Sequence, residues 1–172
     1  ADRSWALSKV KLKRILLVGL GEKDSLSDFA KIARSAIKHA SGASIYSIAW
    51  HTGSFMAKQK SQQITSASVE RIRLLAQIVG DQVYRFGARQ AQFKTKPSEK
   101  PDSLEHFVLL ANTKQASLMK NALQEGSALV EGMNLTKDLG NLPPNVCTPT
   151  FLAQTAQNLP KKTSLRVQVL GQ

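Results

Sequence analysis

The chain has 172 residues, 42% of them hydrophobic and 21% charged, and its net charge is +12. This composition excludes a disordered tail and is typical of a globular protein that buries a core of its own. No apolar run approaches the roughly 20 residues of a membrane-spanning helix, and the charged start at Ala1–Trp5 lacks the apolar stretch of a signal peptide.

The positive charge is concentrated in the first part of the chain. Residues 1–96 contain 17 Lys and Arg against 6 acidic residues, which accounts for +11 of the total. A basic half of this kind favours a polyanionic partner such as nucleic acid. The cations are dispersed, however, and Lys31, Arg34 and Lys38 recur at helical spacing, which is also typical of a solvated helix face. Both interpretations remain open.

The first predicted elements are a strand and a helix. Arg14–Val18 is apolar and branched and predicts a buried strand, with residues 19–21 as its turn. Ser25–Ala40 carries apolar residues at helical spacing and therefore predicts a helix. Ser25 followed three residues later by Asp28 is a variant of the capping box, with Asp in place of the usual Glu.

The same alternation continues over the next hundred residues. The predicted elements are a strand over Ser44–Trp50, a helix over Ser66–Tyr84, a strand over Phe107–Leu110, and a long helix over Thr113–Leu139 mildly broken at Gly126 and Gly132. Polar residues over 51–63 and 94–103 predict loops. Strands separated by such crossovers pair in parallel, so the fold class is α/β, an α/β sandwich with a mostly parallel sheet flanked by helices and right-handed connections.

A rigid joint follows the long helix. Two adjacent prolines in Leu142–Asn145 lack N–H donors and end a helix firmly. Thr148 before Pro149 is typical of an N-cap followed by proline at the first helical position, and it predicts a short helix over Thr150–Leu159. The alternation in Leu165–Leu170 predicts a last strand. On these residues alone, the joint could be an ordinary elbow between domains.

Few residues carry recognisable chemistry. Gly19-Leu20-Gly21 after a strand matches the start of a dinucleotide fingerprint, but no third glycine follows, which favours a tight turn. His39, His51 and His106 lack mutual metal-ligand spacing. The single cysteine, Cys147, excludes an intramolecular disulfide, fits a reducing cytoplasm, and is best explained as a small apolar filler. The sequence therefore predicts no catalytic, cofactor-binding or metal-binding residue in this chain.

One stretch of the sequence is more distinctive than the local structure that it predicts. The sequence KDLGNLPPNVCTPTFLAQTAQ, from Lys137 to Gln157, resembles the segment that opens the catalytic domain of the leucyl (cytosol) aminopeptidase family. That segment has two prolines flanked by asparagine, then Thr-Pro, an aromatic residue and Leu-Ala. Weaker agreement continues upstream in Arg14–Gly21 and in Tyr84–Phe86.

The resemblance implies a macro-domain-like N-terminal α/β domain of three layers, a long connecting helix and a C-terminal peptidase domain. Residues 1–112 would be most of the N-terminal domain, 113–140 the connecting helix, and 141–172 the start of the peptidase domain. The family holds two divalent metal ions, manganese or zinc, in motifs such as Asn-Thr-Asp-Ala-Glu-Gly-Arg-Leu. No such motif occurs before Gln172, so no metal ligand is carried over to this chain.

For the parent protein, the resemblance implies a metal-dependent exopeptidase that releases N-terminal amino acids from peptides, with leucine favoured. It also implies a cytoplasmic homo-hexamer that does not bind membranes. This chain would be the non-catalytic N-terminal portion of that hydrolase. The alternative is a nucleic-acid-binding module that uses the basic half, because phosphate contacts need only accessible Lys and Arg side chains.

Overall fold

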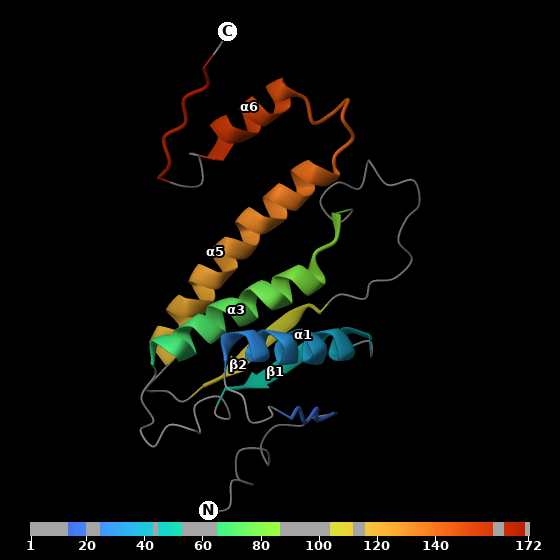
Figure 1. Cartoon of the computed structure of the whole chain (residues 1–172), viewed down its shortest axis with the longest axis vertical. Coiled ribbons are helices and arrows are strands. Elements are labelled where there is room, and N and C mark those ends of the chain that lie inside the picture. The colour runs from blue at the N-terminus through green and yellow to red at the C-terminus, as the bar shows by residue number, and fades with distance from the viewer. Residues whose placement is uncertain are drawn as a thin grey trace, which may run out of the picture. The chain divides into compact units, whose positions relative to one another are not determined.

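The computed structural model describes residues 14–19, 25–42, 45–52, 65–86, 104–111, 116–159 and 164–170. Its elements are α1 (Leu26–Gly42), β1 (Ser47–His51), α3 (Ser66–Val83), β2 (His106–Leu110), α5 (Ala116–Asn141) and α6 (Pro149–Asn158), as Figure 1 shows. The predicted α/β class is confirmed. The chain divides into unit 1, residues 1–83 and 100–130, and unit 2, residues 84–99 and 131–172. The helix α5 therefore supplies residues to both units.

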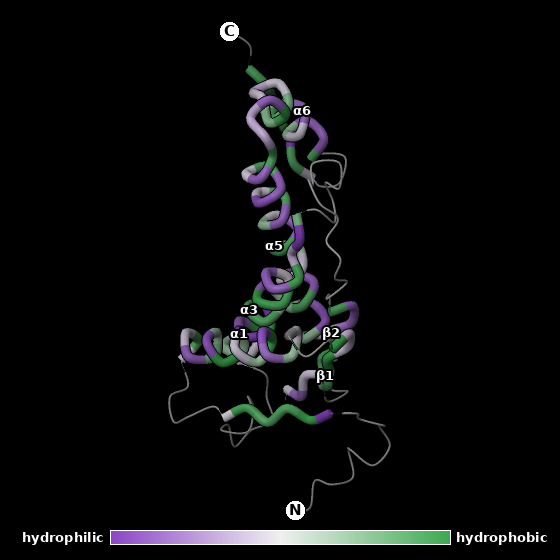
Figure 2. Tube along the Cα trace, turned by 90° about the vertical axis from the view of Figure 1, so that its right-hand side faces the viewer, coloured by the Kyte–Doolittle hydropathy of each residue, from purple (hydrophilic) through white to green (hydrophobic). Residues whose placement is uncertain are grey.

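The helix α1 begins at its predicted cap. The Ser25 hydroxyl accepts the backbone N–H of Asp28 at 3.1 Å and donates to the Asp28 carboxylate at 2.6 Å. This is one arm of a capping box, with the acidic side chain bound to the hydroxyl. One face of α1 is buried, as the alternating hydropathy along its turns in Figure 2 reflects, through Phe29, Ala30, Ala33, Ala36, Ile37 and Ala40. The predicted helix is thus confirmed.

The two strands confirm the predicted parallel pairing. Ser47 lies opposite His106 and His51 lies opposite Leu110, so both strands run in one direction. Alternate residues of each strand point toward the core, where Ile48, Trp50, Phe107 and Leu109 pack against buried side chains. After β1, Thr52 closes the pair, because its N–H and its hydroxyl both donate to the Leu110 carbonyl, at 3.3 and 2.8 Å.

Unit 1 has two clusters of buried apolar side chains. The first joins α1 to α3 and consists of Phe29, Ala30, Ala33, Ile37, Leu75 and Ile78. The second joins α3 to α5 and consists of Ile72, Met119 and Ala122. Fully burying a large aliphatic or aromatic side chain contributes roughly 1.5–3 kcal/mol. The predicted α3 and α5 thus form because each has an apolar face to bury.

Within unit 1, α3 and α5 pack closely at glycine. A Cβ atom on Gly126 would lie 2.7 Å from the Ala76 Cβ and 2.9 Å from the Arg73 carbonyl oxygen. A Cβ atom on Gly80 would lie 2.4 Å from a methyl group of Val130. The prediction that glycine breaks the long helix is therefore wrong, because α5 runs without interruption. At Gly126 the missing side chain admits the neighbouring helix.

An exposed ion-pair network joins the same two helices. The Arg73 guanidinium pairs with Glu70 on its own helix and with Glu125 on α5. The hydrogen bond with Glu125 is the main cause that raises the pKa of Arg73 above its ordinary value. Exposed ion pairs add little stability, so packing at Gly126 determines the approach of the helices.

In unit 2, the predicted joint forms a compact turn. The Leu142 N–H donates to the Leu139 carbonyl at 3.3 Å, where α5 ends. Beyond the two prolines, the N–H groups of Val146 and Cys147 both donate to the Pro143 carbonyl at 2.9 Å. These bonds engage the N–H groups of Val146 and Cys147, and the turn separates α5 from α6.

The helix α6 starts with the predicted cap. Thr148 has an extended backbone, with φ −79° and ψ 163°, and its hydroxyl accepts the Phe151 N–H at 3.3 Å. Pro149 occupies the first turn, where no N–H donor is required. None of the residues of α6 is buried, and its most sheltered side chains, such as Phe151 and Ala153, are half-buried.

Two predicted strands are wrong. Arg14–Val18 and Leu165–Leu170 have no assigned strand structure, and their apolar side chains are exposed, up to 90% for Leu17 and 81% for Leu170. Figure 2 shows the first of these segments as a largely hydrophobic tube. Apolar patterning reports a tendency to be buried, but a strand forms only with a hydrogen-bonded neighbour. The predicted loops fall mostly outside the described residues, except that His51 belongs to β1.

Candidate functional site

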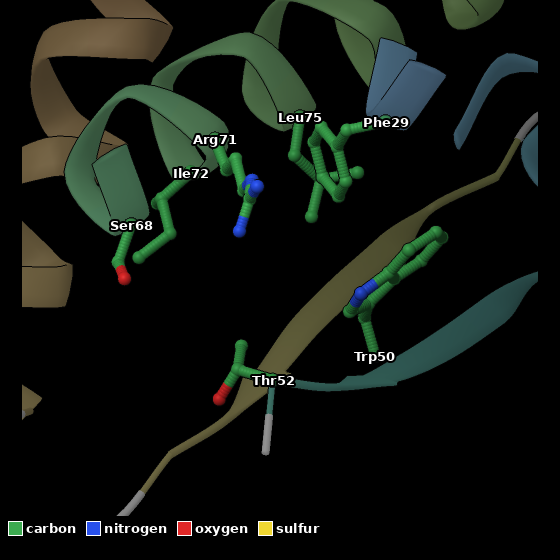
Figure 3. A pocket seen from close by; sticks show the side chains of 7 residues that line it. All are labelled: Phe29, Trp50, Thr52, Ser68, Arg71, Ile72 and Leu75. Carbon is green, nitrogen blue, oxygen red and sulfur yellow. The ribbon is translucent and has the colours of Figure 1, made fainter. Parts of the chain in front are cut away.

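A small cavity lies in unit 1 at the carboxyl end of β1. It is lined by Phe29, Trp50, Thr52, Ser68, Arg71, Ile72 and Leu75, shown in Figure 3. Ligands of open parallel sheets bind beyond the carboxyl ends of the strands, so this is the position where a binding site would be expected.

The polar groups of this cavity are largely engaged. The Thr52 hydroxyl donates to the Leu110 carbonyl at 2.8 Å, and the Ser68 hydroxyl lies 3.3 Å from the Thr65 hydroxyl. Arg71 is buried, with its guanidinium carbon 6.0 Å from the centre of the Phe29 ring. A cation at this distance from an aromatic face is attracted by the ring quadrupole.

The size of the cavity decides its role. Its volume is about 20 Å³, which is enough for about one water molecule, whereas small-molecule sites span roughly 300–1,000 Å³. The cavity is therefore a packing defect beside a buried arginine. It has no space for a substrate.

A second set of polar side chains lies in unit 2. The Tyr84 hydroxyl donates to the Asp138 carboxylate at 2.9 Å, and Asp138 is buried. The Asn141 side-chain amide donates to the Tyr84 oxygen at 3.4 Å, and the Lys137 ammonium lies 4.8 Å from the centre of the Tyr84 ring. Burial is the main cause that raises the pKa of Tyr84, and the hydrogen bond to Asp138 acts in the same direction. Tyr84 is thus a protonated donor at neutral pH.

The histidines are not brought together. His106 opens β2 opposite Ser47, whereas His51 ends β1 opposite Leu110. Four residue steps along a parallel strand separate these two ends by about 13 Å. His39 lies in the last turn of α1. Over the described stretches of the chain, no three His, Cys, Asp or Glu side chains are grouped so that they could hold a metal ion.

The other singled-out residues give no site. A Cβ atom on Gly19 would meet nothing within 4 Å, and Leu20 and Gly21 lie outside the described residues. Cys147 is a free, half-buried thiol in the turn after the prolines. Among the helices that the structure describes, none is both long and apolar enough to cross a membrane.

The predicted basic stripe is present on α1. Lys31, Arg34 and Lys38 are all exposed, and their spacing places them on one face of the helix. The Lys31 ammonium lies 3.9 Å from the Asp28 carboxylate. Three cations on one helix are equally compatible with a solvated face, so they do not support nucleic-acid binding over it.

Sequence reasoning missed the contacts between Tyr84 and the end of α5. Two signals were present, because both Tyr84–Phe86 and Lys137–Gln157 agree with the same family. A hydrogen bond between residues 54 positions apart has no local pattern, so the sequence does not show that these segments meet.

This chain is similar in sequence to a group of known proteins. Residues 3–87 match the family described as "Cytosol aminopeptidase family, N-terminal domain". A "Probable cytosol aminopeptidase" of Ralstonia pickettii (strain 12J) is 33% identical over 160 residues, which cover 92% of this chain and 31% of that protein.

Further relatives agree with this match. A protein with the same name from Paraburkholderia phytofirmans is 36% identical over 168 residues, covering 96% of this chain and 31% of the relative. One from Stutzerimonas stutzeri (strain A1501) is 40% identical over 157 residues, covering 90% of this chain and 29% of the relative. The chain thus spans about three tenths of the length of the curated relatives that it matches.

Proposed function

This chain carries the N-terminal domain of the cytosol aminopeptidase family, and on that premise we propose that it is the non-catalytic portion of a metal-dependent exopeptidase. The parent enzyme would release N-terminal amino acids from peptides, with leucine favoured. The observation that carries the proposal is the alignment of more than nine tenths of this chain with a "Probable cytosol aminopeptidase" of about three times its length.

We propose that the chain consists of three parts. Residues 1–112 form the N-terminal domain, residues 113–140 form the connecting helix, and residues 141–172 begin the peptidase domain. The helix α5 supports this proposal, because it supplies residues to both units of the chain. The double proline after α5 supports the last boundary, because it stops the helix and redirects the chain.

The catalytic chemistry would come from two divalent ions, manganese or zinc, held by residues beyond the aligned stretch. Such a pair supplies an activated water molecule and polarises the scissile carbonyl. The described residues offer no group of ligands that fits such ions. We therefore derive no catalytic step for any residue of this chain. The proposed parent acts in the cytoplasm as a homo-hexamer.

Peptidase assays on two forms of the protein test the proposal. The 172-residue chain, purified alone, should hydrolyse no leucine anilide substrate with added manganese or zinc. The full-length product of the gene that encodes this sequence, translated as far as its own stop codon, should hydrolyse the same substrate. It should lose this activity when a chelator is added. Metal-dependent turnover by the 172-residue chain above a no-protein control would overturn the non-catalytic assignment. An inactive complete gene product would overturn the peptidase assignment.

A further inference from the structure

Unit 2 contains a polar contact set to which the proposed function assigns no role. Tyr84, directly after α3, meets three residues at the end of α5, namely Lys137, Asp138 and Asn141. All four residues belong to unit 2. One aromatic side chain therefore binds one turn of a helix that lies 54 residues further along the chain.

The three contacts differ in chemistry and converge on the same ring. The Tyr84 hydroxyl donates to the buried Asp138 carboxylate at 2.9 Å, which is a charge-assisted hydrogen bond. The Asn141 amide donates both to the Tyr84 oxygen at 3.4 Å and to the Lys137 carbonyl at 2.8 Å. The Lys137 ammonium lies 4.8 Å from the ring centre, within the range of a cation–π contact.

The position of these contacts matters because helix ends are weak. The last four carbonyl groups of a helix have no partner within it, and the last turn is where a helix opens most easily. At the end of α5, the Asn141 side-chain amide also donates to the Lys137 carbonyl at 2.8 Å, and the Leu142 N–H donates to the Leu139 carbonyl at 3.3 Å. The next residues are the buried Leu142 and then Pro143–Pro144, where the chain changes direction.

We propose that Tyr84 is a latch that keeps the last turn of α5 helical and so fixes the direction in which the chain enters the turn at Pro143–Pro144. The latch acts from a segment outside the helix, so the end of α5 depends on where that segment lies. It rests on contacts within unit 2 and is independent of the peptidase assignment.

Amide hydrogen exchange on the whole chain tests the latch. Tyr84→Phe removes only the hydroxyl and retains the ring under Lys137, so the helix should stay folded overall. The amides of Leu139–Leu142 should then exchange about tenfold faster or more, as expected when a hydrogen bond to a charged group is lost from a local opening unit. Tyr46→Phe is the matched control, because Tyr46 is an exposed tyrosine of unit 1.

A second variant removes the other partner of the same hydrogen bond, which lies in α5. Asp138→Ala removes the acceptor while improving the intrinsic helix propensity, so faster exchange there would not come from a poorer helix former. The double variant Tyr84→Phe/Asp138→Ala should exchange little faster than either single variant, because both remove one shared interaction.

Each outcome bears on the proposal. Local acceleration in both single variants, without additivity and without effect in Tyr46→Phe, supports the latch. Exchange at Leu139–Leu142 that stays within about twofold of the unmodified protein in Tyr84→Phe would overturn it. Equal acceleration in the amides of α1 would also overturn it, because the effect would then be global. Fully additive effects would overturn it as well, because the two residues would then act separately.

Discussion

Unit 1 and unit 2 are stabilised by different interactions, although α5 supplies residues to both. Unit 1 has two clusters of buried apolar side chains, and its helices and strands have apolar faces that meet there. In unit 2, α6 has no buried residue and is capped by Thr148. The turn at Pro143 precedes α6, and the contacts of Tyr84 are with the end of α5. A folded region can therefore be specified by burial or by local geometry, and substitutions should distinguish the two.

The largest expected difference lies between the core of unit 1 and the helix α6 of unit 2. Ile37 is only 1% exposed and packs in the first cluster of unit 1, so Ile37→Ala should lower the free energy of unfolding by roughly 2–5 kcal/mol. Leu152→Ala in α6, where the side chain is 44% exposed, should cost less than about 1 kcal/mol. Urea unfolding of both variants measures the two costs. Equal losses would contradict the view that α6 depends less on burial than the core of unit 1 does.

Gly126 and Gly132, two of the glycines of α5, should give smaller effects of opposite sign. Gly126→Ala in unit 1 places a Cβ atom 2.9 Å from a carbonyl oxygen of α3, and such overpacking typically costs about 1–3 kcal/mol. Gly132→Ala in unit 2 meets nothing within 4 Å, so the helix propensity of alanine should stabilise α5 by about 1 kcal/mol. Thermal unfolding should thus shift in opposite directions. A stabilising Gly126→Ala would mean that α3 can move away.

The sequence predicts the helices well because each one carries its own signals. The apolar spacing in α1 and α3, the Ser25 cap, and Thr148 before Pro149 are local patterns, and all of them are found in the structure. The parallel pairing of β1 and β2 also follows from the order of elements, since strands separated by helical crossovers favour it.

The failures concern interactions between distant residues. Arg14–Val18 and Leu165–Leu170 have the composition of strands but no strand structure. The glycine at position 126 also predicts a break in the helix, whereas the structure has a contact with α3 there. The sequence does not show that contact, because it does not say which residue lies against Gly126.

The candidate site was predicted least well, for the same reason. The sequence predicts no catalytic or metal-binding residue in this chain and no role for Tyr84 or Asp138. The structure joins these two side chains by a hydrogen bond, and neither residue lies near the other in the sequence. A polar pair of this kind is found only once the fold has placed its two elements.

The smallest expected effect tests local geometry in unit 2 most directly. A ten-residue helix is marginal by itself, and α6 has no buried side chain to add stability. Its cap is therefore a large part of its stability. Thr148→Ala removes the oxygen that accepts the Phe151 N–H, and such a loss costs about 1 kcal/mol, so the amides of Ala153–Gln157 should exchange roughly fivefold faster.

Two control variants separate the cap from other causes. Thr148→Ser retains the accepting hydroxyl and should keep exchange close to that of the unmodified protein. Thr150→Ala lies inside the helix, where alanine is favoured, and should slow exchange or leave it unchanged. Unfolding of unit 1 should not respond to any of the three. If Thr148→Ala left the exchange of α6 unaltered, packing that involves α6 would outweigh its cap, and the contrast between the two units would be smaller than their burial suggests.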